Sequence, residues 1–536
     1  MYLKSDIMKN LIYFTFVIFS IALWGCQEDQ FADNYPDPSK IANTTIERQY
    51  TGVQVAGIDY VVPAYWNYFV VLRITLNPWT QSIGWINTPN QYIPGSAASD
   101  AVWSNYYGIL AQYREFQKVW SSSTPQQQND RKIFNLTAAA YLYYETQRMV
   151  DLFGSIPFFN AGMLSTNGGD YNVSFAEYDG AEEIYTYMLD ELKTIATELN
   201  NISLNPGFQA SFNAQDIINH GDVQAWKRFV NSLRLRMLNR VSLSPAFSSR
   251  ASAEIAEILS NPSQFPIVTS NDEGIQIDVY DVSTPINSSG FQQGINSAGW
   301  DGDDASKIMI DFLNASSDPR LRVMFEPGTA ANGVYVGLDP LLAGNTQQAL
   351  VNDGEIAYYN RSTFSENQFF PGVLISASEV NFIKAEYYLR SGNDAQAKAA
   401  YEEGIRQSID FYYTIRENSN SSVSGSPALP TEQEITNLLA SAPVNWNGAT
   451  SQGEKIRLIG MQKWLHFNIV QPYQNWAEVR RLNVPQLSFW VDNSSTQTQP
   501  PVRWRIPGEE LTYNEANYDA VRSNDNLTTK IFWDVD

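Results

Sequence analysis

The chain has few of the residues that build disulfides and metal sites. It contains one cysteine, Cys26, and two histidines, His220 and His466, among 536 residues. A single thiol cannot close an internal disulfide, and two distant histidines do not have the spacing of a zinc cluster. We therefore expect no metal and no cofactor, and we expect both histidines to be ordinary packed or surface residues. The nucleophile motif Gly-x-Ser-x-Gly is also absent, so nothing indicates that class of hydrolase.

Basic residues are scarce as well. The chain has 35 Lys and Arg against 57 Asp and Glu, a net charge of −22. An acidic surface of this size repels phosphate backbones, which argues against a nucleic-acid partner. Charged residues make up 17% of the chain, below the usual ~25%, whereas hydrophobic residues reach 43%. This composition predicts a folded protein.

Hydrophobic runs long enough to cross a membrane are absent. The longest apolar run, 11–24, is shorter than the ~20 residues that a spanning helix needs. With Lys9 in front of it, the run is typical of a secretory signal. Leu23-Trp24-Gly25-Cys26 resembles the lipobox of bacterial lipoproteins, with the small Gly25 before the cleavage site.

This resemblance implies that residues 1–25 are a lipoprotein signal peptide and that Cys26 becomes the lipidated N-terminus. The alternative is an ordinary signal peptide with a buried free thiol. Gln27-Glu28-Asp29 resembles the signal that sends some lipoproteins to the exterior face of the outer membrane. Residues 26–45 contain two prolines among short polar residues, which favours an extended tether.

The rest of the chain shows mostly helical patterning. Residues 46–536 exceed the ~250–300 residues at which one core stops growing, so we expect a core extended lengthwise, as in helical repeats. Helix-like spacing runs with interruptions from 46 to about 73 and returns at 101–120. Apolar residues also recur every three or four positions in 132–153, 181–199, 222–241, 253–259, 305–313, 378–409, 431–439, 453–467 and 475–482.

The segment 378–409 has the clearest repeat-like pattern. Small residues at Ala385, Ala397 and Gly404 would let two antiparallel helices approach closely, with Tyr388 and Tyr401 between them. This spacing resembles a tetratricopeptide unit of ~34 residues, which must stack on other units to bury its apolar face. We place helical repeats at roughly 130–260 and 378–482.

Three stretches are rich in Asn, Ser, Gly and Pro, and they predict an irregular layer. They cover roughly 74–100, 261–377 and 413–452, with possible short strands at 274–280 and 333–337. Asp301-Gly302-Asp303-Asp304 fails the EF-hand pattern because Ala305 and Ser306 follow. We expect Asp304 to cap the helix that follows, and we expect 46–536 to form one domain.

Several motifs occur in a fixed order along the chain. A helix-ending stretch contains Asp151, Phe153, Gly154 and Pro157. The later motifs are Tyr178-Asp179 with Glu183-Ile184-Tyr185; Gly221-Asp222 with Trp226, Phe229, Asn231, Leu233 and Arg236; Asp318-Pro319-Arg320-Leu321; Glu379-Val380-Asn381-Phe382-Ile383 with Ala385-Glu386; Gln462-Lys463-Trp464 with Trp476, Glu478, Arg480-Arg481 and Pro485; and Phe532-Trp533-Asp534. Together they resemble the SusD/RagB family of outer-membrane nutrient-binding lipoproteins, and in particular its SusD-like branch.

The resemblance implies a mostly α fold of four tetratricopeptide-like helix pairs, capped by an irregular layer with a few short strands. It also implies a partner, a TonB-dependent SusC-like transporter in the outer membrane, which receives the captured nutrient. No catalysis belongs to the family. Most of its motifs are structural, so we expect Arg480 and Arg481 to pair with carboxylates and helix ends, and Trp226 and Trp464 to lie in the core.

The ligand-binding residues of this family lie in variable loops, so no motif identifies them here. A Trp or Tyr ring can cover the apolar face of a sugar at low entropy cost, and loops over a rigid scaffold often carry binding residues. Aromatic residues among chain breakers and amides are therefore our ligand-binding candidates. They are Trp79, Trp85, Tyr92, Trp300, Tyr359 and Trp446.

The leading hypothesis is a surface protein that binds oligosaccharide or polysaccharide without catalysis. The first alternative keeps this role with a peptide as cargo. The second is a surface glycoside hydrolase, because 57 carboxylates could supply an acid–base pair. The third is a tetratricopeptide scaffold that binds only proteins.

Overall fold

Long helices make up most of the fold in the computed structural model, which describes residues 44–296, 303–423, 425 and 427–535. Residues Ile46–Asp536 belong to one compact unit. The signal peptide 1–25, Cys26, nearly all of the tether 26–45 and Trp300 lie outside the described residues. The long helices are α3 (Ile46–Ala56), α6 (Ser96–Ser122), α8 (Lys132–Phe153), α9 (Ala181–Leu199), α11 (Val223–Val241), α12 (Ser248–Ser260), α17 (Ala377–Arg390), α18 (Asp394–Glu417), α20 (Gln452–Phe467) and α21 (Pro472–Leu482).

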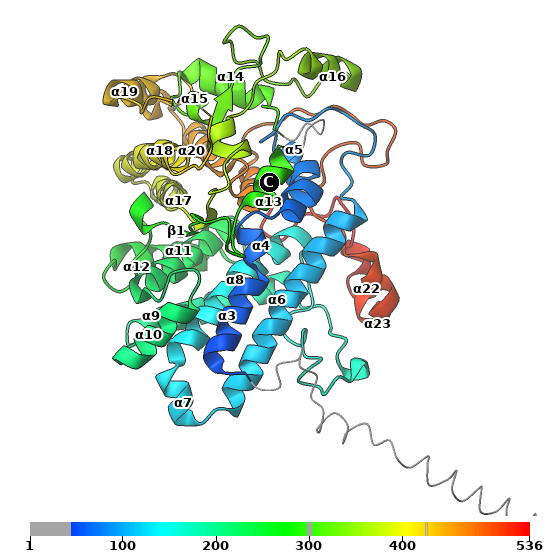
Figure 1. Ribbon diagram of the computed structural model, residues 1–536, viewed down its shortest axis with the longest axis vertical. Helices are drawn as coiled ribbons and strands as arrows, with labels where there is room; N and C mark the ends of the chain where they lie inside the picture. Colours follow the sequence, from blue (N-terminus) through cyan, green and yellow to red (C-terminus); the bar gives the residue numbers. More distant parts are fainter. Residues whose placement is uncertain (1–43, 297–302, 424, 426, 536) are drawn as a thin grey trace, which may run out of the picture. The chain divides into compact units, whose positions relative to one another are not determined.

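Shorter elements connect these helices and form the irregular layer. The short helices are α4 (Ile58–Val61), α5 (Leu76–Trp79), α7 (Pro125–Asp130), α10 (Pro206–Gln215), α13 (Ser289–Ile295), α14 (Lys307–Ser316), α15 (Leu321–Met324), α16 (Gly344–Asn352), α19 (Glu432–Ala440), α22 (Gly508–Tyr513) and α23 (Glu515–Tyr518). The π and 3-10 turns are η1 (Trp66–Val71), η2 (Leu72–Ile74), η3 (Tyr171–Val173), η4 (Asn271–Glu273), η5 (Arg361–Ser365), η6 (Trp446–Gly448) and η7 (Arg522–Asn524). In Figure 1, α14, α15, α16 and α19 gather at the top, above the long helices.

The long helices pack against one another in chain order. Helix α3 packs on α6, α6 on α8, α8 on α9, α9 on α11, and α11 on α12. In the second half, α17 packs on α18 and α20, and α20 packs on α21. Helix α11 also contacts α17 and joins the two halves (Figure 1). The expected mostly α fold with repeated helix packing and a few short strands is confirmed.

The α17–α18 pair shows why small residues are needed at its interface. A Cβ built on Gly404 would lie 2.5 Å from the Phe382 ring, so only glycine allows this close approach. The turn between the helices uses Gly392 at φ +80°, a conformation that glycine adopts without strain. Asn393 then caps α18 through a hydrogen bond from Gln396 N. The predicted helical hairpin at 378–409 is confirmed.

Strands are short and few among the described residues. Strand β1 (Ile275–Ile277) pairs antiparallel with β4 (Gly372–Ile375), and β2 (Phe325–Glu326) pairs antiparallel with β3 (Tyr358–Tyr359). The predicted strand at 274–280 forms over its first half. The strand predicted at 333–337 does not form; in this region only Leu338 makes a single bridge, with Ser306.

The prediction that Asp304 caps a helix is wrong. Helix α14 begins two residues later than expected, at Lys307, and its N-cap residue is Ser306. Asp304 lies instead in an isolated bridge with Tyr358 and is buried. The bridge with Tyr358 holds Asp304 two residues before the N-cap position, so tertiary pairing overrides the local capping preference.

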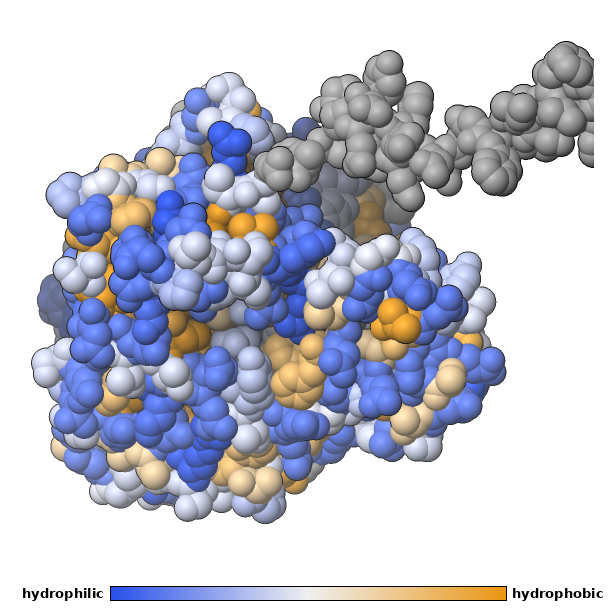
Figure 2. Space-filling model, turned by 90° about the horizontal axis from the view of Figure 1, so that it is seen from below, coloured by the Kyte–Doolittle hydropathy of each residue, from blue (hydrophilic) through white to orange (hydrophobic). Residues whose placement is uncertain are grey.

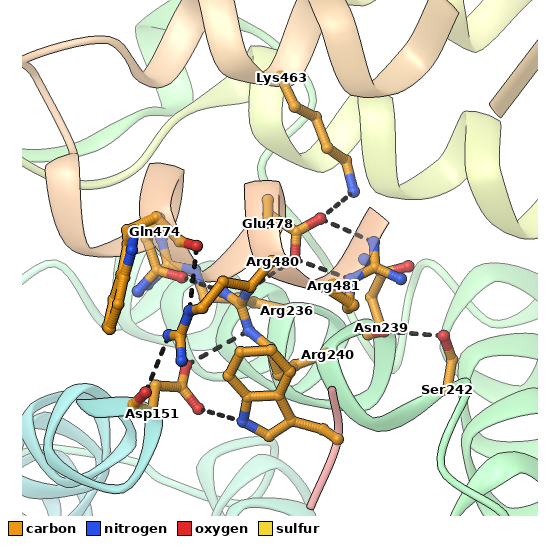
Figure 3. A network of polar contacts seen from close by, with 12 residues as sticks. Asp151, Arg236, Asn239, Arg240, Ser242, Lys463, Gln474, Glu478, Arg480 and Arg481 are labelled. Carbon is orange, nitrogen blue, oxygen red and sulfur yellow. Dashed lines mark hydrogen bonds and ion pairs between the residues drawn. The ribbon is translucent and has the colours of Figure 1, made fainter. Parts of the chain in front are cut away.

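A buried ionic network links both helical halves (Figure 3). Arg481 on α21 contacts Glu478 on the same helix at 2.7 Å and Glu386 on α17 at 2.6 Å. Lys463 on α20 contacts the same two carboxylates at 2.8 and 3.0 Å. Arg240 on α11 extends the network to Glu478 at 2.7 Å. Buried charges need such pairing, so the network fixes how α11, α17, α20 and α21 meet.

One face of the molecule is mostly polar. The face at the bottom of Figure 1, where α7 lies, is largely hydrophilic with scattered hydrophobic residues (Figure 2). Among the described residues, no single helix has both the length and the hydropathy for a membrane span. One bent pair, Ile46–Val61 with Trp66–Trp79, meets these criteria jointly, by length and composition only.

Candidate ligand-binding site

A row of aromatic rings with one guanidinium lies along η1 and η2. The Tyr65 and Phe69 rings stack with centroids 5.0 Å apart and planes inclined by 17°. The Arg73 guanidinium carbon lies 4.2 Å from the Phe69 ring centroid and 5.4 Å from that of Trp85. Tyr65 is 40% exposed, and Phe69 and Trp85 are half-buried. We call Tyr65, Phe69, Arg73 and Trp85 the aromatic stripe.

The local sequence explains why these side chains line up. Tyr65, Phe69 and Arg73 are four residues apart, so in a helical segment they lie along one face. Between them, Tyr68 points inward, is fully buried and packs edge-on against Phe291 of α13 at 5.0 Å. A Cβ on Gly290 would lie 2.6 Å from Tyr65 N, so glycine lets α13 approach the start of the stripe.

Amide side chains are linked by hydrogen bonds at α13, the helix that packs against η1. Gln292 on α13 accepts a hydrogen bond from Gln368 Nε2 at 3.2 Å. The backbone N–H of Gln368 donates to Asn420 Oδ1 at 2.9 Å. Trp85 itself shares a pocket with three other amide side chains, those of Gln81, Asn87 and Gln91. Aromatic faces with neighbouring amides can bind a ligand that has both an apolar face and hydroxyl groups.

Three of the six predicted candidates line one small pocket next to the stripe. Trp79, Trp85 and Tyr92 share it with Gln91 and Phe489. The Trp79 indole is almost fully buried and donates to Gln91 O at 3.2 Å. The Tyr92 hydroxyl donates to Trp490 O at 2.6 Å, and burial raises its pKa to about 12. Trp85 belongs to both the pocket and the stripe.

The other described candidates lie elsewhere in the fold. Tyr359 is fully buried, donates to Ser82 O at 2.7 Å and also bonds Asn468 Oδ1. Its burial raises the pKa of the hydroxyl well above the ordinary value. Trp446 is 2% exposed, and its ring centroid lies 5.1 Å from that of Tyr401. The structure therefore brings Trp79, Trp85 and Tyr92 together at one pocket, which Tyr359 and Trp446 do not line.

Sequence reasoning missed Tyr65, Phe69 and Arg73. The available signal was the four-residue spacing of two aromatics and an arginine, but the segment 46–73 was assigned as ordinary helix. Within the described ranges, no three His, Cys, Asp or Glu side chains are grouped so that they could hold a metal ion. The site therefore offers aromatic faces, amides and one guanidinium.

Comparison with known proteins identifies similar folds. The model of a family of SusD-like proteins, described as starch-binding and associating with the outer membrane, matches residues 77–507. A SusD homologue from Bacteroides fragilis has a TM-score of 0.73 at 20% identity and covers 91% of this chain and 100% of its own. Comparison with the curated proteins gives no match.

Two further similar structures belong to proteins that are described as chitin-binding. A chitin-binding protein has a TM-score of 0.73 at 21% identity, covering 92% of this chain and 100% of its own. A chitin-binding SusD homologue from Flavobacterium johnsoniae has a TM-score of 0.67 at 20% identity, covering 91% and 99%. At these identities the likeness shows the fold.

Proposed function

The chain belongs to the SusD-like family, and from this premise we propose that it is a non-catalytic nutrient-binding lipoprotein on the exterior of the outer membrane. We propose that it captures oligosaccharide or polysaccharide and passes it to a TonB-dependent SusC-like transporter. The family description, starch-binding and associating with the outer membrane, supports this role. The two chitin-binding relatives support a glycan as the cargo.

The aromatic stripe is the observation that carries the glycan assignment. Tyr65 and Trp85 are partly exposed, so their rings can cover the apolar faces of sugar units, while Gln91 of the adjoining pocket can bond hydroxyls. The net charge of −22 disfavours polyanions. We therefore propose a neutral glycan. Of the sequence candidates, Trp85 is central to this proposal, Trp79 and Tyr92 support it from the pocket, and Trp300 remains a candidate.

Replacing the stripe residues should weaken glycan binding without unfolding the protein. We expect Tyr65→Ala and Trp85→Ala each to raise the dissociation constant about fivefold, because each removes one stacking face worth about 1 kcal/mol. The measurement is retardation of Gln27–Asp536 in native gels cast with neutral and uronate polysaccharides. Melting temperatures of both variants should stay close to the wild-type value.

Tyr513→Ala is the matched control, since Tyr513 is 68% exposed and lies on α22, outside the stripe. If Tyr513→Ala loses as much retardation as Tyr65→Ala and Trp85→Ala, the stripe has no specific role in glycan binding. Shortening of the polysaccharide chains would favour the hydrolase alternative. If the protein binds peptides and none of the glycans, the peptide alternative is established.

The transporter and membrane parts of the proposal use other regions. We retain Cys26 as the proposed lipid anchor.

An exposed apolar cluster is a candidate transporter contact, because large exposed apolar patches mark interaction sites. It comprises Tyr171, Val173, Phe175, Leu511 and Tyr513. Asn514 and Asn517 donate to the Ala176 and Phe175 carbonyls and hold its two segments together.

The charges around this apolar cluster define the partner surface. Residues 170–177 and 508–519 contain no Lys or Arg. Their acidic residues are Asp170, Glu177, Glu509, Glu510, Glu515 and Asp519. Arg522 pairs with Asp519 at 2.6 Å and lies 3.9 Å from Glu515, so the net charge of the rim comes from the other four carboxylates. Such a rim would repel a second copy of itself and anionic lipid, and it complements a protein face with a basic rim. We propose that the SusC-like transporter presents this face.

The double variant Tyr171→Ala/Tyr513→Ala should reduce complex formation with the transporter. We expect co-purification with a co-expressed, tagged SusC-like transporter to fall at least fivefold, because two central apolar contacts are lost. Tyr280→Ala is the control, since Tyr280 is 60% exposed but lies outside the cluster. Undiminished co-purification of the double variant would overturn this assignment and leave the glycan-binding proposal intact.

A further inference from the structure

An open cleft lies near the C-terminal end of α6, away from the aromatic stripe. Its walls include Gln117, Lys118 and Trp120 of α6, Asn135 of α8, and Thr166 of the loop after α8. Trp120 is half-buried, and its ring lies 6.2 Å from that of Phe116 with planes inclined by 22°. Phe116 therefore supports the indole from inside the fold.

The walls of the cleft are fixed by hydrogen bonds. Arg114 Nη2 donates to the carbonyls of Phe158 and Phe159 at 2.7 and 3.0 Å, and Nε donates to Ala161 O at 3.1 Å. Lys118 Nζ donates to Ser165 O at 3.2 Å. These bonds hold the loop 158–166 on α6. A preformed cleft loses less entropy when it binds a ligand.

Several polar groups around the indole are available to a ligand. Gln117 Oε1 accepts from Arg114 Nη1 at 2.8 Å, so the amide is oriented. Among the described residues, no hydrogen bond is found for the Trp120 Nε1 or the side chains of Asn135 and Thr166. An aromatic ring bordered by amide, indole and hydroxyl groups has the chemistry that binds a sugar unit, because it matches an apolar face with a rim of hydroxyls.

We propose that this cleft is a second glycan-binding site, which takes another segment of the same neutral polysaccharide as the stripe. The inference rests on the proposed function. Tyr60 connects the two regions: its hydroxyl donates to Val102 O of α6 at 2.8 Å, and its ring lies 5.1 Å from that of Trp66, next to Tyr65. At 1.5 Å per residue, Val102 and Trp120 are about 27 Å apart along α6.

Two separate sites respond differently to long and short chains. A polysaccharide that occupies the stripe raises its own local concentration at the cleft, so binding at both sites gives avidity. An oligosaccharide too short to span them binds each site separately. The cleft therefore adds most to the binding of polymers.

The test compares wild type, Trp120→Ala, Trp120→Phe, Trp85→Ala and the double variant Trp85→Ala/Trp120→Ala. Each is run in native gels with the neutral polysaccharide that retards the wild type, and each is titrated calorimetrically with short oligosaccharides of that polymer. We expect Trp120→Ala to weaken polymer binding at least fivefold and short-oligosaccharide binding less than twofold. Trp120→Phe keeps a stacking face and should retain most polymer binding. Residual retardation in Trp85→Ala should disappear in the double variant.

Each contrary result identifies what has failed. Retardation of Trp120→Ala equal to the wild type, in both backgrounds, would overturn the second site and leave the proposed function standing. An equal loss for short and long ligands, with an unchanged melting temperature, would also overturn a separate site. Absence of retardation of the wild type by every polysaccharide would overturn the glycan function itself and the cleft proposal with it. If Trp120→Ala lowers the melting temperature, Trp120→Phe decides, and the proposal fails if its polymer binding is as weak as that of Trp120→Ala.

Discussion

Glu386→Gln should lower the free energy of unfolding by about 3–5 kcal/mol, the usual cost of breaking a buried ion pair from one side. Glu386 is fully buried and accepts hydrogen bonds from Arg481 Nη1 and Nη2 at 2.8 and 2.6 Å and from Lys463 Nζ at 3.0 Å. The substitution keeps the shape of the side chain but removes its charge. Lys463 and Arg481 then share the carboxylate of Glu478, which already pairs with Arg240 (Figure 3). Urea unfolding at pH 7 measures the loss.

A surface pair provides the matched control for this experiment. Glu432 contacts Arg406 at 2.7 Å but is largely exposed, and exposed pairs contribute little to stability. Glu432→Gln should therefore leave the urea midpoint unchanged. If Glu386→Gln is as stable as the wild type, the network is not needed to hold α17, α20 and α21 together.

The same network should resist acid. Arg481 and Lys463 hold the pKa of the Glu386 and Glu478 carboxyls well below the ordinary value, against the opposing effect of burial. A lowered folded-state pKa stabilises the protein above the unfolded-state pKa, and this contribution is lost as the pH falls toward the folded-state value. The ionic network therefore keeps its full contribution at neutral pH and weakens only in acid.

His466 should make the protein sensitive to mild acid. Burial, aided by the Arg320 charge, lowers the pKa of His466 to about 3. Its ring nitrogens lie 2.8 Å from Ser376 Oγ and 3.1 Å from Ser408 Oγ. Because the pKa is about 6.5 in the unfolded chain, neutral His466 stabilises the fold above that pH. The contribution declines as the pH falls toward 3, by about 3 kcal/mol at pH 4.

The measurement is the free energy of unfolding of wild type and His466→Gln at pH 7.5 and pH 4. Glutamine does not titrate, so the variant should lose about 3 kcal/mol less stability between these pH values than the wild type. His220→Gln is the control, because His220 is the other histidine and is exposed. Equal pH dependence of wild type and His466→Gln would show that His466 does not carry the effect.

The positions of the long helices followed from the sequence because their signals are local. The prediction 132–153 matches α8 at both ends, since Gly154 adopts φ +78° directly after the last helical residue. Trp226 and Trp464 are buried, as their helical spacing predicted. Arg480 donates to the Val502 and Asp151 carbonyls, and Arg481 contacts Glu386, so their expected structural roles are also confirmed.

The arrangement of possible binding residues depended on contacts that no local pattern contains. Trp79 and Tyr359 look alike in sequence, as aromatics in polar surroundings, but the fold places Trp79 at a pocket and buries Tyr359 against Ser82. The stripe forms because residues 65–73 meet Trp85 across a turn. The cleft forms because Arg114 holds the loop 158–166 on α6.

The sequence by itself determined the helices, because periodicity and capping act over a few residues at a time, and it indicated the family through the order of motifs along the chain. The tertiary structure alone decided which rings keep an open face. That choice depends on long-range packing: η1 against α13, and α8 and its following loop against α6. A ring is available to a ligand only where this packing leaves one side uncovered.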